Sequence, residues 1–380
     1  MRDGWVDYKF KDVATAIKGK LPKSKNEDGI GVPYLTASYL RSSQPDYWIE
    51  NLEGAITAED GDCLILWDGA GAGDLFSARR GVVSSTMAVV TTQNSKILRE
   101  FLTLFISSKA DYIKETCRGT TVPHVSPDAI ANMDLKIPPL PEQKRIVDLI
   151  SSVDSYIEAL QQQLESAKKS RNAVLHELMY SDPNLTEVSL FEVCEFINGK
   201  AHEKNIDKHG KFIVINSKFI SSNGQVKKYS NKQFCPAIKD DITMVMSDLP
   251  NGKALGKCFY VSKDLTFTVN QRVCILRAKS IKPEYLFLLL DRNPYFLSFD
   301  NGVSQTNLSN RVFSDFKVKI NSSQKHQAYI VDLASNFDYV IRNSQIALVK
   351  ASKLKESLLS DLLSGKYEIP ASYDKVIGAA

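Results

Sequence analysis

The sequence predicts an α+β chain with two pseudo-repeated mixed α/β domains, joined by two long helices that form an antiparallel coiled coil. Three observations lead to this fold class. The chain matches itself at a shift of about 180 to 185 residues, short apolar runs fill the first part of each copy, and heptad-spaced apolar residues fill the second part. An internal repeat determines the whole architecture, so it is established first.

The repeat rests on short matches that occur in the same order in both copies. The segment FKDVATAIKGK at 10–20 corresponds to LFEVCEFINGK at 190–200, and IVDL occurs at both 146–149 and 330–333. The order and near-constant spacing of the matches indicate a duplication. The predicted boundaries are domain 1 at 1–137, helical spacer 1 at 138–184, domain 2 at 185–320, helical spacer 2 at 321–366 and a C-terminal tail at 367–380.

Composition is typical of a folded protein that works inside the cell. The chain is 43% hydrophobic and 24% charged, which excludes disordered and fibrous chains, and its length of 380 residues suggests two domains. No apolar run is long enough for a membrane span, and the N-terminus does not resemble a signal peptide. The six cysteines form no C-x-x-C pair, so free thiols in a cytoplasmic protein are expected.

Within each domain, apolar runs separated by Gly, Asn, Asp and Ser clusters predict strands and loops. Residues 63–66 and 273–276 are expected to be strands, and 98–113 and 283–290 to be helices. The first long helix is expected to begin at the prolines near 138–141 and to run to about Tyr180.

Both long helices carry apolar residues at alternating steps of four and three, the spacing of a coiled-coil seam. Each stripe has one basic residue at the same place, Arg171 and Lys355. Thirty-three residues would make a rod of roughly 50 Å, which favours pairing of the helices with each other. The alternative is that each stripe packs on its own domain. The predicted seam residues are Ile146, Ile150, Val153, Ile157, Leu160, Leu164, Val174, Leu178, Ile330, Phe337, Ile341, Leu348, Leu358 and Leu362.

Two similar domains on antiparallel helices would be related by a pseudo-twofold axis, as are the half-sites of many DNA targets. Domain 2 has a net charge of +7 and domain 1 a net charge of −2, so binding by charge alone is not expected. Loop side chains that could read base edges or bind phosphates are therefore the candidates. In domain 1 they are Lys20, Lys23, Lys25, Ser38, Arg41, Arg79, Arg80, Arg118, Thr120, Thr121 and His124. In domain 2 they are Lys200, Lys204, Asn216, Lys218, Lys253, Lys257, Gln271, Arg272, Ser304, Gln305 and Asn307.

The run IPPLPEQKRI at 137–146 resembles the start of the helical region in specificity subunits of type I restriction-modification enzymes. The KGK and NGK turns, the strand DCLIL at 62–66 and the element GTTVPHV at 119–125 support this resemblance, which covers the whole chain. The second copy reads KINSSQKHQ at 319–327 without prolines, so its helix start is expected to differ in shape.

The resemblance implies that each domain is a target recognition domain reading one half of a bipartite, asymmetric site in double-stranded DNA. The paired helices would set the spacer and dock two methylation subunits, which would bring S-adenosylmethionine. A restriction subunit that translocates DNA would join this core. The chain itself would be non-catalytic and would need no cofactor or metal.

Patterns typical of enzymes are incomplete in this sequence. The glycines of 69–73 lack the clean helix of a nucleotide-binding unit, and Asn293-Pro294 lacks the second proline of an amino-methyltransferase tetrapeptide. The carboxylates Asp128 and Glu142 do not follow the nuclease pattern, because Glu142 comes after three prolines. Two alternatives stay open: a coiled-coil adaptor with two protein-binding domains, and a self-contained DNA methyltransferase or nuclease.

Overall fold

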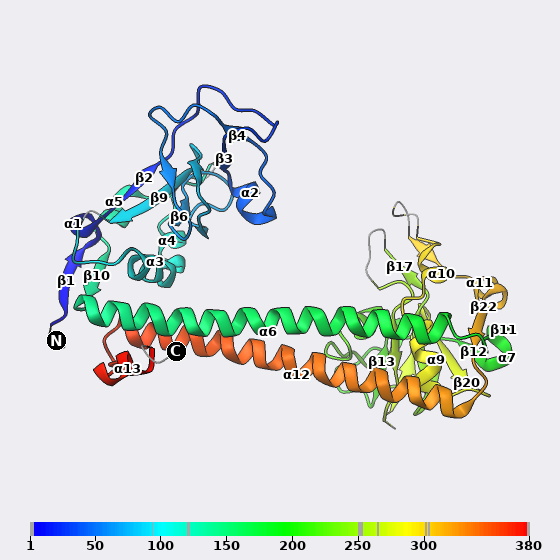
Figure 1. Cartoon of the computed structure of the whole chain (residues 1–380). Coiled ribbons are helices and arrows are strands. Elements are labelled where there is room, and N and C mark those ends of the chain that lie inside the picture. The colour runs from blue at the N-terminus through cyan, green and yellow to red at the C-terminus, as the bar shows by residue number, and fades with distance from the viewer. Residues whose placement is uncertain are drawn as a thin grey trace. The chain divides into compact units, whose positions relative to one another are not determined.

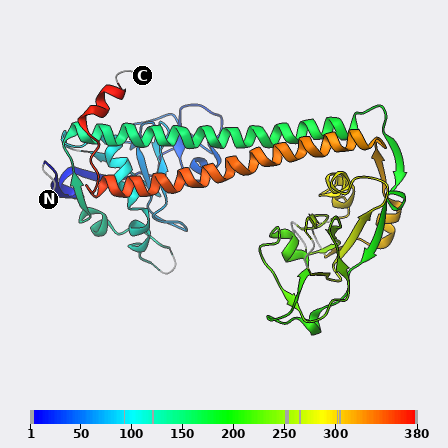
Figure 2. The same cartoon turned by 90° about the horizontal axis from the view of Figure 1, so that it is seen from below.

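The computed structural model describes residues 4–92, 94–119, 122–249, 254–263, 266–300, 302 and 305–377. It divides into two compact units (Figures 1 and 2). Unit 1 contains residues 1–161 and 346–380, and unit 2 contains residues 162–345. Each unit thus combines one α/β domain with one part of each long helix.

Domain 1 is built from two four-stranded sheets. The first is antiparallel, in the order β2 (Ala14–Lys18), β9 (Met87–Thr92), β6 (Cys63–Leu66), β7 (Leu75–Ser77). The second has the order β4 (Trp48–Ile49), β3 (Val32–Leu35), β8 (Gly81–Val83), β5 (Thr57–Ala58), with β3 and β8 parallel. The helices of domain 1 are α1 (Phe10–Val13), α2 (Ala37–Ser42), α3 (Arg99–Ser108), α4 (Ala110–Glu115) and α5 (Pro127–Ala131).

Alternation along β6 explains how the layers of domain 1 stack. Cys63 and Ile65 pack in a cluster with Phe101 and Phe105 of α3, whereas Leu64 and Leu66 pack in another cluster with the second sheet and α2. Successive side chains of a strand point to opposite faces, so a strand with all four residues buried must be covered on both sides. The first sheet is therefore the middle layer.

Domain 2 repeats this topology strand for strand. Its first sheet has the order β12 (Cys194–Asn198), β20 (Val273–Ala278), β16 (Ile242–Val245), β18 (Cys258–Tyr260). Its second sheet has the order β14 (Tyr229–Ser230), β13 (Phe212–Ile215), β19 (Phe267–Val269), β15 (Pro236–Ala237), with β13 and β19 parallel. The helices are α7 (Leu190–Val193), η1 (Glu203–Asn205), α8 (Ser217–Ser221), α9 (Pro283–Leu290), α10 (Pro294–Leu297) and α11 (Asn310–Asp315). A short pair, β17 (Ser247–Asp248) with β21 (Thr306–Asn307), is added.

A two-stranded antiparallel ribbon connects each domain to the long helix that follows it. In unit 1 the ribbon is β1 (Val6–Lys9) with β10 (Asp134–Ile137), and in unit 2 it is β11 (Thr186–Ser189) with β22 (Lys317–Ile320). The long helices α6 (Leu140–Tyr180) and α12 (Gln324–Leu363) begin directly after these ribbons. The tail ends in η2 (Ala371–Tyr373) and α13 (Asp374–Ile377).

The two long helices lie antiparallel in each unit. In unit 1, Ile146 and Ile150 of α6 share a buried cluster with Leu359 and Leu362 of α12. In unit 2, Leu175 and Met179 share a buried cluster with Ile330 and Ala334. Together with the repeated domains, this confirms the predicted fold class. All predicted seam residues are buried or half-buried.

The packing also shows that both interpretations of the apolar stripes are partly correct. The clusters that hold the helix ends together include residues of the domain cores, such as Phe105 in unit 1 and Tyr285 in unit 2. The stripes therefore pair with each other and also complete their own domains.

Two ion pairs between the helices are related by the repeat. In unit 2, Arg171 Nε lies 2.7 Å from Asp338 Oδ1, and in unit 1, Lys355 Nζ lies 2.5 Å from Asp154 Oδ1. The shift that aligns the two IVDL segments also aligns Arg171 with Lys355 and Asp154 with Asp338. Each basic residue in the stripe thus meets an aspartate on the opposite helix, which specifies one register of the antiparallel pair.

Most of the predicted elements agree with the structure, and two differ in detail: the strand expected at 273–276 extends to Ala278 in β20, and the helix expected at 98–113 is not continuous. The expected helix at 98–113 is divided into α3 and α4, because Lys109 leaves the helical conformation with φ −104° and ψ 13°. Leu98 is the residue that precedes α3, and its backbone is extended. No helix among the described residues is long and apolar enough to cross a membrane.

Separate and combined substitution of Arg171 and Asp338 with alanine should reveal a coupling free energy of about 1 kcal/mol. The pair is partly buried and uses two guanidinium nitrogens, which makes it stronger than an average surface pair. Chemical unfolding of the four proteins at low and high salt measures the coupling. The cycle on Asp154 and Lys355 is the matched comparison, and we expect its monodentate pair to give a smaller value. A coupling of zero for Arg171 and Asp338 at low salt would contradict the register role.

Candidate nucleic-acid interface

The structure gathers several predicted DNA-contacting residues of domain 2 at one loop end. Gln271, Arg272, Gln305 and Asn307 line a hollow of about 220 Å³ together with Ser247. All four of these predicted side chains are exposed. A groove with amide and guanidinium groups offers both donors and acceptors, as base edges and phosphates require.

Short backbone pairings hold this loop end together. Ser247 pairs with Asn307 in the β17–β21 ladder, and Gln305 Nε2 donates to Ser247 Oγ at 2.7 Å. Gln271 Nε2 donates to Glu203 Oε1 at 3.1 Å, next to the predicted residue Lys204. A single bridge pairs Lys200 with Asn270. The hollow and both of these lysines therefore belong to one set of adjoining loops.

The KGK and NGK turns allow this arrangement because their glycines lie against backbone. A Cβ at Gly199 would lie 2.1 Å from Asn270 O, and a Cβ at Gly19 would lie 2.2 Å from Val83 O. Val83 belongs to β8, and Asn270 O accepts a hydrogen bond from Val273 N, so neither carbonyl can move freely and only glycine fits. The turns place Lys20 and Lys200 directly beside the strand ends.

Domain 1 has the equivalent loop end with different side chains. The bridge between Asp68 and His124 corresponds to the pairing of Ser247 with Asn307. His124 also pairs with Arg118, and both side chains are exposed. Lys18 Nζ lies 2.5 Å from Asp68 Oδ2. The polar group here is thus a histidine, an arginine and a lysine–aspartate pair.

Three predicted arginines of domain 1 each have a partner within the domain. Arg41 binds Asp74 at 2.7 Å, and Arg79 donates to Ser43 Oγ at 3.3 Å. Arg80 is 4.0 Å from Glu59. Hydrogen bonds from Lys114 and then Arg41 lower the pKa of Asp74, so this carboxylate stays charged at acidic pH and keeps Arg41 in place.

The remaining described candidates of domain 1 occupy other surfaces. Lys20 and Lys23 line a hollow of about 180 Å³ with Asn51 and Glu53. Lys25 Nζ lies 3.4 Å above the Tyr47 ring, a cation–π contact. Ser38 is exposed on α2.

In domain 2, Asn216 has a structural role that the sequence analysis did not assign. Its side-chain oxygen accepts from Phe219 N at 2.9 Å and caps α8. Lys218 is exposed on α8, and Lys257 Nζ donates to Ser221 O at the end of the same helix. Four candidates lie outside the described residues: Thr120, Thr121, Lys253 and Ser304.

The two loop ends also contain residues that the sequence did not point to. Lys18, Asp68 and Ser247 lie at the equivalent loop ends but were not among the candidates. In domain 1, residues 84–86 occupy the position of Gln271 and Arg272, because each segment directly precedes the central strand β9 or β20. Aligning the candidates Gln271 and Arg272 with domain 1 points to residues 84–86, whereas no candidate of either copy aligns with Lys18, Asp68 or Ser247.

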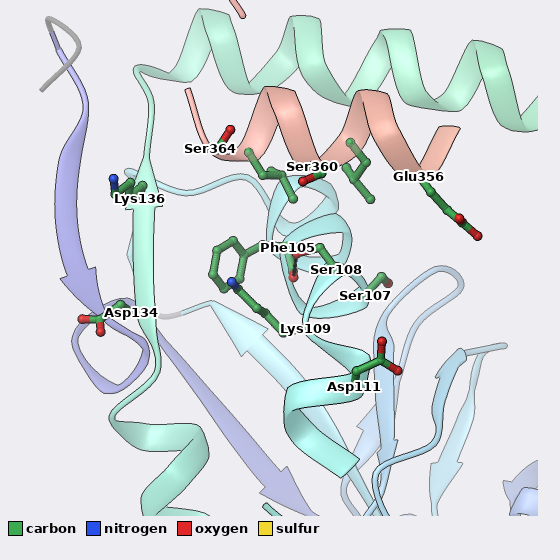
Figure 3. Close-up of a pocket in the computed structure, with 12 residues that line it drawn as sticks. Phe105, Ser107, Ser108, Lys109, Asp111, Asp134, Lys136, Glu356, Ser360 and Ser364 are labelled. Carbon is green, nitrogen blue, oxygen red and sulfur yellow. Dashed lines mark hydrogen bonds between the residues drawn. The ribbon is translucent and has the colours of Figure 1, made fainter. Parts of the chain in front are cut away.

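A larger hollow in unit 1 does not fit nucleic acid. It has a volume of about 640 Å³ and lies between α3, α4, β10 and the end of α12 (Figure 3). Asp111, Asp134 and Glu356 line it, against two lysines, Lys109 and Lys136. An excess of carboxylates would repel phosphates.

The titratable side chains of the described residues do not gather as metal ligands do, and the Cys63 and Cys194 thiols are deeply buried. No three His, Cys, Asp or Glu side chains among them converge on a possible metal position. The six cysteines are free, and burial raises the pKa of the Cys63 and Cys194 thiols to about 12. These two thiols are therefore protonated at neutral pH and unreactive.

Gly199→Ala should lower the thermal unfolding midpoint of the protein by about 5 °C, because its Cβ would overlap two backbone oxygens. Differential scanning calorimetry of the intact chain measures the midpoint. The neighbouring substitution Lys200→Ala removes an exposed side chain and should leave the midpoint unchanged. Equal midpoints for the two variants would show that the turn does not require glycine.

Comparison with known proteins identifies the family. The model of the type I restriction modification DNA specificity domain matches twice, at residues 2–169 and 184–351. The chain is 23% identical to the MjaVIII specificity subunit of Methanocaldococcus jannaschii, covering 97% of this chain and 94% of that protein. It is 24% identical to the EcoBI specificity subunit of Escherichia coli over 46% of this chain and 38% of that one.

Solved structures show the same fold. A type I restriction-modification S subunit from M. genitalium matches with a TM-score of 0.59 at 15% identity, covering 94% of this chain and 96% of that one. A chain from a study of complex assembly in the type I system matches with a TM-score of 0.63 at 15% identity, covering 96% and 98%. With two copies of the specificity domain on a repeated fold, this chain belongs to the type I restriction-modification DNA specificity family.

Proposed function

We propose that the chain is the DNA sequence-specificity subunit of a type I restriction-modification complex and acts in the cytoplasm. Each domain would read one half of a bipartite, asymmetric site in double-stranded DNA. The observation that carries this proposal is the pair of equivalent loop ends, which have the same backbone pairing and different side chains.

The chemistry of the two loop ends supports an asymmetric site. Domain 2 offers Gln271, Arg272 and Asn307, and amide and guanidinium groups are suited to adenine and guanine edges. Domain 1 offers Arg118 and His124 at the equivalent loop end. Because the backbone pairing is the same and the side chains differ, the two domains would prefer different bases.

The long helices would set the spacing between the half-sites and dock two methylation subunits. Exposed apolar side chains on α12 support a docking role: Tyr339 in unit 2 is 67% exposed, and Leu354 in unit 1 is 61% exposed. S-adenosylmethionine would be bound by the methylation subunits. A restriction subunit that translocates DNA would complete the complex. This chain would supply DNA sequence recognition and no catalysis.

Footprinting of the chain together with its methylation subunits tests the proposal. We expect two short protected patches on DNA, separated by a gap of unread bases. Protection that is indifferent to sequence, or no protection, would instead favour a protein-binding adaptor. Methyl transfer or cleavage by the chain alone would favour a self-contained methyltransferase or nuclease.

Arg272→Ala should weaken binding to the half-site read by domain 2 by about 10-fold to 100-fold, because one good base contact contributes roughly 1–3 kcal/mol. The measurement is a competition assay with DNA altered in one half-site at a time. Lys319→Ala is the matched control, since it removes one exposed positive charge of domain 2 on the β22 ribbon. Equal losses for the two variants would indicate that only net charge matters at Arg272.

A further inference from the structure

A buried glutamine occupies the same position in the first turn of each long helix. Gln143 is the fourth residue of α6, and Gln327 is the fourth residue of α12. Both side chains are fully buried, with 0% exposure. The shift that aligns the two IVDL segments also aligns these two positions, so the repeat relates the glutamines in the same way as the ion pairs.

In unit 1 the amide group of Gln143 connects three segments. Its Oε1 accepts from Leu98 N at 2.8 Å, and Leu98 is the residue that caps α3. Its Nε2 donates to Lys96 O and to Pro138 O, each at 2.8 Å. Helix α3 belongs to the core of domain 1, and Pro138 lies between the ribbon and α6.

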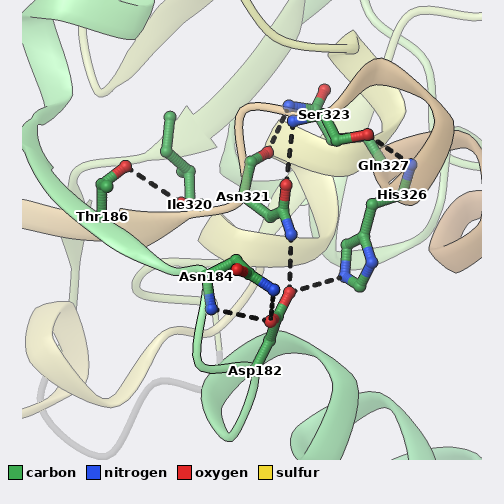
Figure 4. A network of polar contacts seen from close by, with 8 residues as sticks. All are labelled: Asp182, Asn184, Thr186, Ile320, Asn321, Ser323, His326 and Gln327. Atoms are coloured by element: carbon green, nitrogen blue, oxygen red, sulfur yellow. Dashed lines mark hydrogen bonds and ion pairs between the residues drawn. The ribbon is translucent and has the colours of Figure 1, made fainter.

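In unit 2 the same connection recurs with other residues. Gln327 Oε1 accepts from Lys282 N at 2.8 Å, and Lys282 caps α9. Gln327 Nε2 donates to Asn321 O at 2.8 Å, between the ribbon and α12 (Figure 4). The carbonyl of Ser280, which corresponds to Lys96 O, accepts from Gln324 at 3.1 Å instead.

Only an amide side chain can make these bonds. It presents an acceptor and two donor hydrogens on one planar group. A glutamate would direct a buried negative charge at carbonyl oxygens, and a leucine or methionine would leave the capping N–H without a partner. Each loss costs free energy, because the site is closed to water.

The role of the glutamine follows from the other connections between each domain and its long helix. The ribbon joining a domain to its long helix has only two strands, and two-stranded ribbons are weak on their own. The glutamine adds a tie from the long helix to a different part of the domain, the start of α3 or α9. The apolar clusters shared by each domain and the long helices hold the two together without a preferred direction, and the glutamine adds directed hydrogen bonds that fix their rotation.

We propose that Gln143 and Gln327 are positioning residues that hold each domain at one orientation to its helical segment, and so set the register in which each half-site is read. The proposal rests on the proposed function. It assigns to the buried glutamine in the Pro-Leu-Pro-Glu-Gln run a part in sequence discrimination, although its side chain is closed to solvent and cannot touch DNA.

The test uses Gln143→Met and Gln327→Met in the complex with the methylation subunits. Binding is measured on DNA altered in one half-site at a time and on DNA with the spacer changed by one base pair. Gln143→Met should reduce discrimination at the half-site of domain 1 by about tenfold and leave the other half-site unchanged, and Gln327→Met should do the reverse. Both variants should tolerate altered spacers better than the unmodified protein.

Matched controls separate positioning from general loss of structure. Gln161→Met and Gln345→Met make the same change at exposed positions on the same helices and should leave discrimination unchanged. Leu98→Pro and Lys282→Pro remove the donor N–H at φ angles of −74° and −62° that already suit proline, and Leu98→Pro also removes a side chain that packs on the core of domain 1. These variants should reproduce the methionine effects even if a methionine variant fails to fold. Equal loss at both half-sites in folded variants, or no loss, would overturn the proposal.

Hydrogen exchange tests the positioning role without DNA. The amides of Leu98 and Lys282 should exchange slowly in the unmodified chain and about a hundredfold faster in the methionine variants. Unchanged exchange would also overturn the proposal. If the unmodified complex shows no sequence discrimination while the exchange effect is present, the proposed function fails and the glutamine tie stands.

Discussion

The packing of α6 against α12 is the contact on which each unit depends. Without it, the apolar residues that face α3 in unit 1 and α9 in unit 2 would lose one wall of their clusters. Each domain core is therefore completed by side chains from both long helices, and one of those helices is distant in sequence. The domains and the helices cannot be considered as independent modules that happen to be linked.

Much of the frame could be predicted because it depends on periodicity. The buried strand at 63–66 and the helix at 283–290 have the bounds that their apolar runs indicated. The break at Lys109 was not visible, because nothing in local composition marks a residue that leaves the helix between two good helical segments. The hydrogen-bond partners of the two buried glutamines could not be predicted either, because they are backbone atoms, whose positions depend on the fold.

The loop chemistry was harder to predict for a physical reason. An exposed arginine in the sequence can contact DNA or an aspartate of its own domain, and Arg41 does the latter through Asp74. Asn216 appeared to be a base-reading amide, yet its oxygen caps a helix. Residue type therefore gives the possible contacts, and only the fold decides which partner is near enough.

Comparing the first turn of α12 with that of α6 shows which contacts between domain and helix occur in both copies. Without prolines the start of α12 was expected to differ, but Gln327 makes the same two kinds of bond as Gln143. The difference lies beside the glutamine. In unit 1 the Trp5 indole donates to Glu142, and in unit 2 His326 lies 3.4 Å from Asp182 (Figure 4). The polar contacts beside the glutamine therefore differ between the two copies, whereas the bonds from the glutamine to the helix cap and to the residue after the ribbon are kept.

The spacing between the two copies shows which parts of the chain vary in length and which do not. Between the starts of β6 and β8 the chain runs from Cys63 to Gly81, whereas between the equivalent strands β16 and β19 it runs from Ile242 to Phe267, so domain 2 is longer there. The shift between α3 and α9 nevertheless equals the shift between the long helices, which also relates both ion pairs and both glutamines. Insertions are absorbed inside a domain before its chain reaches the helix. A chain built this way can change the loops of each domain while the length and register of its helices stay the same.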